Sequence, residues 1–131
     1  MSTTDERGEL TLRTVAMPSD VNVNGDIFGG WVLSQMDIAA DIVSRETAKG
    51  RVATVAVDAM KFIQPVKVGD VLCVYTNINR IGNTSIAVGI EAWVLRGVIG
   101  EREKVTEAVF TFVAIDDKGK PRAVVQSTNK A

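Results

Sequence analysis

Histidine is absent from the 131 residues of this sequence. Its absence excludes Ser-His-Asp and Cys-His catalysis, metal sites built on histidine ligands, and histidine general bases. If the protein is an enzyme, we therefore expect its acid–base group to be a carboxylate, a lysine or a tyrosine.

Cysteine occurs once, at Cys73, which excludes an intrachain disulfide and is typical of a reducing compartment. Its position within an apolar stretch predicts a small buried side chain. No apolar run is long enough to span a bilayer, and Met1–Arg7 lacks the apolar core of a signal peptide. We therefore expect a cytoplasmic protein without integral membrane association.

Charge is nearly balanced, with a formal net charge of -1. This excludes a general electrostatic attraction for nucleic acid or for a membrane surface. The 46% apolar and 24% charged content is that of an ordinary globular protein. We expect one domain over residues 1–131, with loose ends at about 1–8 and 126–131.

A glycine-rich stretch, Asn24–Trp31 (NGDIFGGW), leads directly into the only strongly helical pattern in the sequence. We expect the helix to reach about Ala48–Lys49 and Gly50 to end it. Its apolar face recurs at helical spacing and consists of Val32, Met36, Ala39 or Ala40, and Val43. A narrow polar stripe remains, formed by Ser34, Asp37, Asp41 and Ser44. Most of the helix surface must therefore be covered by other elements.

Most other segments have the alternation and the β-branched residues of strands. The predicted strands are residues 9–16, 51–62, 71–81, 84–96 and 105–115, and residues 121–124 add a short edge segment. In the second of these, alternation predicts that Val55, Val57 and Ala59 share a face. Gly82–Asn83 predicts a hairpin turn. The order β-α-β-β-β-β predicts an α+β fold, with an antiparallel sheet wrapped around one helix.

The role of the pair Gly29–Gly30 can be interpreted in two ways. It lacks the spacing and the lysine of a phosphate-binding loop, and it does not open a repeating βαβ unit. Glycines at a helix start expose backbone N–H groups at the positive end of the helix dipole, where a carbonyl oxygen that becomes negative would be stabilised. The alternative is that they only let a loop pass closely under the sheet.

Asp37 lies about two turns into the helix and also has two readings. It is either a solvated carboxylate on the polar stripe or a base or nucleophile in a partly dry cleft. The pattern alone favours the first reading. The second gains weight from the apolar character of the helix, the absence of histidine and the N–H donors at the nearby helix start. Asn22 and Asn24 precede the helix, where turn formation or capping competes with holding a water or a carbonyl.

Residues Pro18–Trp31 (PSDVNVNGDIFGGW) with Ser34–Asp37 (SQMD) closely resemble the YciA-type acyl-CoA thioesterases of the hotdog superfamily. The resemblance continues through Thr54–Val57, Phe62–Asp70 and Ala108–Ala114, and covers about residues 10–124. It implies a hotdog fold, dimers whose sheets join edge to edge, and trimers of dimers. The implied activity is hydrolysis of acyl-CoA to free fatty acid and CoA, a reaction of fatty acid metabolism.

The resemblance also implies residue roles. The catalytic carboxylate falls on Asp37, the asparagine expected from the partner subunit falls on Asn22, and the amide donors fall on Gly29 and Gly30. It implies neither a metal nor a cofactor, because the CoA thioester is the substrate. The CoA moiety is expected over the turn formed by Gly82, Asn83, Thr84 and Ser85. A non-catalytic acyl-CoA-binding or regulatory module stays open as an alternative, whereas a histidine-dependent hotdog dehydratase does not fit.

Overall fold

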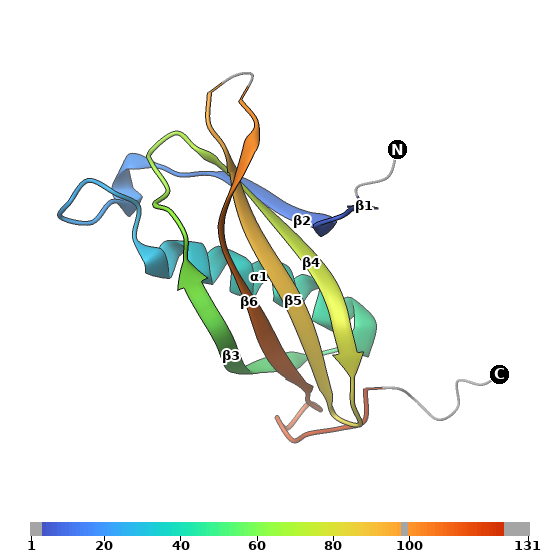
Figure 1. The fold of residues 1–131 in the computed structure, drawn as a ribbon. Helices are drawn as coiled ribbons and strands as arrows, with labels where there is room; N and C mark the ends of the chain where they lie inside the picture. Colours follow the sequence, from blue (N-terminus) through green and yellow to red (C-terminus); the bar gives the residue numbers. More distant parts are fainter. Residues whose placement is uncertain (1–3, 98–99, 125–131) are drawn as a thin grey trace.

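The computed structural model describes residues 4–97 and 100–124, which form one antiparallel sheet with helix α1 (Gly29–Ala48) lying across one of its faces (Figure 1). The strands are β1 (Thr4–Asp5), β2 (Gly8–Val15), β3 (Val52–Phe62), β4 (Val71–Ile81), β5 (Ser85–Leu95) and β6 (Arg102–Ala114). A short 3-10 helix, η1 (Pro18–Asp20), follows β2. The predicted α+β class is confirmed, and the element order is as predicted except for the additional β1 and η1.

The strand order across the sheet is β1-β2-β4-β5-β6-β3. β4, β5 and β6 are consecutive antiparallel neighbours, as their short connections predict. β2 and β3, which flank α1 in the sequence, lie on opposite sides of this central group and pair with β4 and β6. The connection from β2 to β3 through α1 therefore crosses over β4, β5 and β6. β3 is an edge strand with one unpaired side.

The core lies between α1 and the sheet face that it covers. The predicted helix face is buried, with Val32, Met36, Ala39, Ala40 and Val43 all inaccessible or nearly so. They pack against the inward residues of the central strands, which include Ile86, Val88, Ile90, Phe110 and Phe112. Alanines at the middle of the helix let its backbone come close to the bulky side chains of the sheet. Each large apolar side chain buried here contributes about 1.5–3 kcal/mol.

Three details differ from the sequence expectations. Residues 4–8 are not a loose arm, because Thr4 and Asp5 pair with Glu9 and Gly8 across a tight hairpin. β6 begins at Arg102 rather than near 105, because it continues its pairing with β5 as far as Leu95. Residues 1–3, 98–99 and 125–131, including the expected tail at 126–131, lie outside the described residues.

Ser44 was expected on the polar stripe of the helix but is fully buried. It lies between Ala40 and Ala48 on one i, i+4 row, and both of these alanines are buried. Its hydroxyl has no hydrogen-bond partner among the described residues. The covered face of α1 is therefore broader near its C-terminal end than the sequence pattern predicts.

Among the described residues, α1 is not apolar enough to serve as a membrane-crossing segment, and no other helix approaches the length needed. The buried state expected for Cys73 is confirmed. The expected cytoplasmic location stays a prediction.

The end of α1 differs from the glycine stop that the sequence predicts. Lys49, not Gly50, adopts the left-handed conformation, with φ 55° and ψ 45°. Gly50 has another role: a Cβ there would lie 2.5 Å from Nη2 of Arg122, so that side chain would have to move. That guanidinium nitrogen donates to the carbonyl of Ala48 at 3.0 Å, so a close approach of Arg122 caps the helix.

We expect Lys49→Gly to raise the free energy of unfolding by about 1 kcal/mol, because glycine adopts a positive φ without a Cβ penalty. Gly50→Ala is the matched change one residue on, and we expect it to lower that free energy by about 1 kcal/mol by displacing Arg122 from Ala48. Urea unfolding of both variants measures the two effects. Equal effects of the two changes would contradict this account of the helix end.

Candidate active site

The N-terminus of α1 is not capped by a side chain. Phe28 is the N-cap residue, with an extended backbone and no side-chain hydrogen bond, and the first turn contains no acidic residue. The N–H groups of Gly29 and Gly30 belong to this first turn, where intrahelical acceptors are missing. The positive end of the helix is therefore not neutralised by a side chain of its own first turn.

A cavity of about 300 Å³ lies beside this helix end, and we call it the Asp37 cavity. Gly30, Ser34 and Asp37 line it from α1, since positions i, i+4 and i+7 share one helix face. Its remaining lining residues are Leu33, Thr54, Val57 and Phe110. Asp37 is partly buried.

Thr54 was not singled out as a functional residue from the sequence. Its hydroxyl Oγ1 donates to Oδ1 of Asp37 at 2.7 Å, across from β3 to α1. This bond orients the carboxylate and leaves Oδ2 to act on a ligand. The sequence contains only a weak indication of this role, because threonine is common in strands rich in β-branched residues.

A bulge in β3 explains how Thr54 and Val57 can both line the Asp37 cavity. Residues three apart face opposite sides of a regular strand. The pairing of β3 with β6 shifts between Thr54 and Ala56, which lets both side chains reach the same side. The predicted alternation through this strand is therefore wrong here: Val57 lines the cavity, whereas Val55 does not and is 57% exposed.

A second cavity, of about 360 Å³, contains Asn22 and Gly29, and we call it the Asn22 cavity. Its other lining residues are Asp26, Ile27, Val32, Phe62, Ile63, Gln64, Pro65 and Val66. The Oδ1 atom of Asn22 accepts backbone N–H groups of Asn24 at 2.8 Å and of Asp26 at 3.2 Å. These two bonds fix the side-chain amide, so that its NH₂ group is the part left to donate to a ligand.

The two cavities share no lining residue. Within one chain the structure brings Asp37 together with Gly30, and Asn22 together with Gly29, but does not bring Asp37 and Asn22 into one cavity. Asn24 is exposed, and its N–H serves the turn around Asn22.

The expected CoA-binding turn joins β4 to β5. Gly82 donates its N–H to the carbonyl of Ser85 at 2.8 Å, while the carbonyls of Thr84 and Asn83 accept N–H groups of Ala114 and Val124. The turn is thus tied to the end of the described chain. It lines neither the Asp37 cavity nor the Asn22 cavity.

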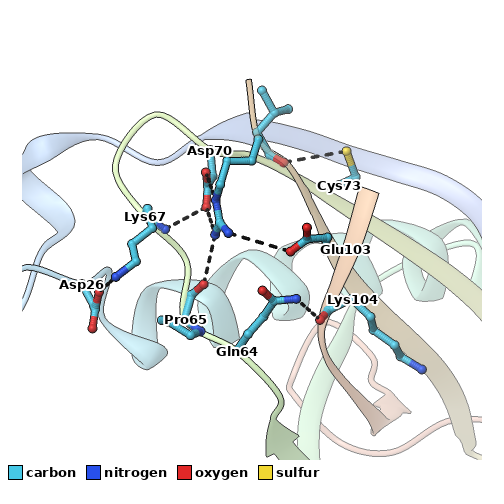
Figure 2. A network of polar contacts seen from close by, with 10 residues as sticks. Asp26, Gln64, Pro65, Lys67, Asp70, Cys73, Glu103 and Lys104 are labelled. Carbon is cyan, nitrogen blue, oxygen red and sulfur yellow. Dashed lines mark hydrogen bonds and ion pairs between the residues drawn. The ribbon is translucent and has the colours of Figure 1, made fainter. Parts of the chain in front are cut away.

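A network of polar contacts lies next to the Asn22 cavity (Figure 2). Its centre is the carboxylate of Asp70, which is 2% exposed and bonded to the guanidinium of Arg96 through two nitrogens. The hydrogen bond to Asp70 raises the pKa of Arg96, against a smaller opposing effect of burial. Lys67, which is in the same loop as Asp70, pairs with Asp26.

The described residues contain no group of three or more cysteine, aspartate or glutamate side chains arranged to hold a metal ion. Along the first two turns of α1, one cavity holds a carboxylate, a hydroxyl and a glycine of the helix start, and the other holds a carboxamide and the second glycine. These groups can polarise a carbonyl and activate a water or attack directly.

An antiparallel sheet wrapped around one long helix defines a hotdog-fold protein. A family model described as "Thioesterase superfamily" matches residues 24–100. The acyl-CoA thioester hydrolase YciA of Escherichia coli is 54% identical over 129 residues, covering 95% of this chain and 98% of that protein. The chain therefore belongs to the thioesterase superfamily and, within it, to the YciA-type acyl-CoA thioester hydrolases.

Solved structures agree with this assignment. HI0827, a hexameric broad-specificity acyl-coenzyme A thioesterase solved as an Asp-to-Ala mutant, superposes with a TM-score of 0.88 at 52% identity, covering 94% of this chain and 91% of that chain. An acyl-CoA hydrolase of Staphylococcus aureus, solved with butyryl coenzyme A and coenzyme A, has a TM-score of 0.79 at 28% identity, covering 86% of this chain and 68% of that chain.

The Staphylococcus aureus enzyme was also solved with alanine in place of one asparagine, one aspartate and one threonine. Along its chain the asparagine precedes the aspartate by 15 positions, and the threonine follows the aspartate by 17. The same two spacings separate Asn22, Asp37 and Thr54 in this sequence.

The hydrogen bonds of Asn22 can be tested apart from any activity. We expect Asn22→Ala to lower the free energy of unfolding by about 1 kcal/mol, because two backbone N–H groups lose their acceptor. Asn22→Asp keeps an oxygen at that place, so we expect stability near that of the unaltered protein. Urea unfolding compares the two variants, and equal losses would contradict the arrangement described here.

Proposed function

We propose that this chain hydrolyses acyl-CoA thioesters to free fatty acid and CoA with Asp37 as the catalytic carboxylate and helix N-terminal amides as carbonyl donors. The observation that carries the proposal is the 2.7 Å bond from Thr54 to Asp37, in a cavity that Gly30 also lines. Residues 1–131 act as one hotdog domain, and the CoA thioester is the substrate rather than a cofactor.

In this proposal, the thioester carbonyl lies at the start of α1. As the carbonyl carbon becomes tetrahedral, its oxygen gains negative charge, which the N–H groups of Gly29 or Gly30 and the helix dipole stabilise. Removing one such donor typically costs about 3 kcal/mol of barrier stabilisation. Gly30 lines the Asp37 cavity, whereas Gly29 lines the Asn22 cavity, so Gly30 is the donor next to Asp37 in the same chain.

Asp37 acts either as a general base or as a nucleophile. As a base, it takes a proton from water, whose oxygen bonds to the carbonyl carbon, and the C–S bond then breaks with the proton passing to the CoA thiolate. As a nucleophile, its carboxylate oxygen bonds to the carbonyl carbon and the C–S bond breaks, which releases the CoA thiolate and leaves an anhydride. Water then hydrolyses the anhydride to fatty acid and the Asp37 carboxylate, and a proton from that water passes to the thiolate. In both routes Thr54 holds Oδ1 and directs Oδ2 at the reaction. The matching positions altered in the Staphylococcus aureus hydrolase support this set of residues.

Asn22 is supplied by the partner subunit in this proposal. Within one chain its amide faces a cavity separate from that of Asp37. β3 is an unpaired edge with apolar residues exposed along it, and Ile38 on α1 is also 48% exposed. Pairing two β3 edges would extend the sheet across two chains and cover this apolar surface. Hexameric relatives support further assembly into a trimer of dimers.

CoA is expected to lie along this interface, with its polar end over Gly82, Asn83, Thr84 and Ser85 of one subunit. Neither cavity of the single chain includes this turn, so the contact requires the substrate to extend beyond both cavities.

We expect Asp37→Asn to lower kcat/KM for acyl-CoA by about 10²–10⁴-fold, because the amide neither accepts a proton nor attacks the carbonyl. Asp41→Asn is the matched control, since Asp41 lies one turn further along α1 and pairs with Arg45 at 3.0 Å. Release of free thiol from several acyl-CoAs measures both variants. Unchanged turnover in Asp37→Asn would reject the assignment, and binding without turnover by the unaltered protein would favour an acyl-CoA-binding module.

The shared site predicts complementation between inactive variants. We expect Asp37→Asn and Asn22→Asp to be nearly inactive as separate proteins, whereas a mixed dimer has one site with both residues intact. Random pairing of equal amounts makes half of the dimers mixed, so about a quarter of the unaltered activity should return. The mixture is prepared by co-expression and assayed by thiol release. Activity no greater than the mean of the two variants would place Asn22 and Asp37 of each site in one chain.

A further inference from the structure

The loop of residues 63–70, between β3 and β4, forms one wall of the Asn22 cavity. Ile63, Gln64, Pro65 and Val66 line that cavity. The loop lies outside the paired strands, so the sheet ladder alone does not fix its position. What fixes it is a set of hydrogen bonds to Lys104 on β6, to Arg96 just after β5 and to the backbone of Ala16 just after β2. Figure 2 shows the side-chain part of this network around Asp70.

Arg96 provides the strongest of these contacts, directly after the end of β5. Its Nε donates to Oδ1 of Asp70 at 2.9 Å and its Nη2 donates to Oδ2 at 2.7 Å. The same Nη2 donates to the carbonyl of Pro65 at 3.3 Å. One planar guanidinium therefore binds both ends of the loop, and a lysine cannot reproduce this geometry.

Asp70 forms further hydrogen bonds, both within the loop and with the segment that follows β2. Its Oδ2 accepts the N–H of Lys67 at 2.8 Å, which closes the loop into a turn. Its backbone carbonyl accepts the N–H of Ala16 at 3.0 Å, and the N–H of Gly69 is bonded to the carbonyl of Ala16 at 2.8 Å. The Asp70 carboxylate is nearly inaccessible, and its hydrogen-bond donors are the guanidinium of Arg96 and the N–H of Lys67.

The loop in turn holds the segment that carries Asn22. The carbonyl of Val66 accepts the N–H of Ile27 at 3.0 Å, and Nζ of Lys67 pairs with the carboxylate of Asp26 at 2.5 Å. Asp26 then contacts Asn22 twice: its N–H donates to Oδ1 of Asn22 at 3.2 Å, and its carbonyl accepts the N–H of Asn22 at 2.7 Å.

We propose that Arg96 is a positioning residue for Asn22, acting through Asp70, Pro65 and the 63–70 loop. The contacts form one continuous path from the end of β5 to the Asn22 amide. This inference rests on the proposed function, because it assigns Arg96 a part in presenting Asn22 to the thioester. Arg96 is not a catalytic residue, since its side chain lines neither of the two cavities.

The test is a double-mutant cycle between Arg96→Gln and Asn22→Asp, read as kcat at saturating acyl-CoA. We expect Arg96→Gln to lower kcat by about 10- to 100-fold in the unaltered protein, the loss typical of a misplaced group. In the Asn22→Asp background we expect no further loss, because the amide that Arg96 positions is already absent. We expect Arg96→Lys to restore part of kcat through a single hydrogen bond to Asp70.

Two controls separate positioning from loss of stability. Glu103→Gln alters the outer neighbour of Arg96, whose carboxylate is 3.8 Å away and exposed, and should leave kcat unchanged. Val94→Ala shortens a fully buried side chain on β5, the strand that leads to Arg96, and should lower Tm without lowering kcat. If Arg96→Gln does not fold, Arg96→Lys takes its place in the cycle.

The possible results separate the positioning role of Arg96 from the proposed role of Asn22. Losses in kcat that multiply in the double variant, or an equal loss in Val94→Ala, would overturn the positioning role and leave the proposed function intact. Full turnover in Asn22→Asp would overturn the assignment of Asn22 in the proposed function, and the positioning role with it. A loss in Arg96→Gln that vanishes only in the Asn22→Asp background supports the positioning role.

Discussion

The burial of one face of α1 against the sheet is the constraint on which the rest of the structure depends. Val32, Met36 and Ala40 must point at the sheet, and this fixes the rotation of the helix. The row of Gly30, Ser34 and Asp37 then lies at the border of the covered face, next to β3. The same packing that excludes water from the core therefore places a carboxylate at its margin, where a substrate can reach it.

The single chain leaves this arrangement incomplete. β3 ends the sheet with an unpaired edge, and apolar side chains of α1 and β3 stay exposed around the Asp37 cavity. The carboxamide of Asn22 belongs to a separate cavity, held by its own turn and by the 63–70 loop. In the proposed function, a second chain paired along this edge supplies the other wall of the site.

Most elements could be predicted from local pattern, because amphipathic spacing and turn residues act over a few positions. β4 (Val71–Ile81) was predicted to the residue, and the buried face of α1 was predicted correctly. Several of the failures involve distant partners. Ser44 is buried because the sheet covers its row on the helix. Thr54 was missed because its partner is on another element.

The sequence by itself determined the fold class, the helix with its glycine start, and the choice of Asp37 as the acid–base candidate in a chain without histidine. It could do so because hydrophobic period and residue chemistry are local properties. Only the tertiary structure decided that Thr54 orients Asp37, that a bulge brings Val57 to the same cavity, and that Arg96 holds the loop beside Asn22. These depend on strand register and side-chain approach, which are set when residues far apart in the chain pack together.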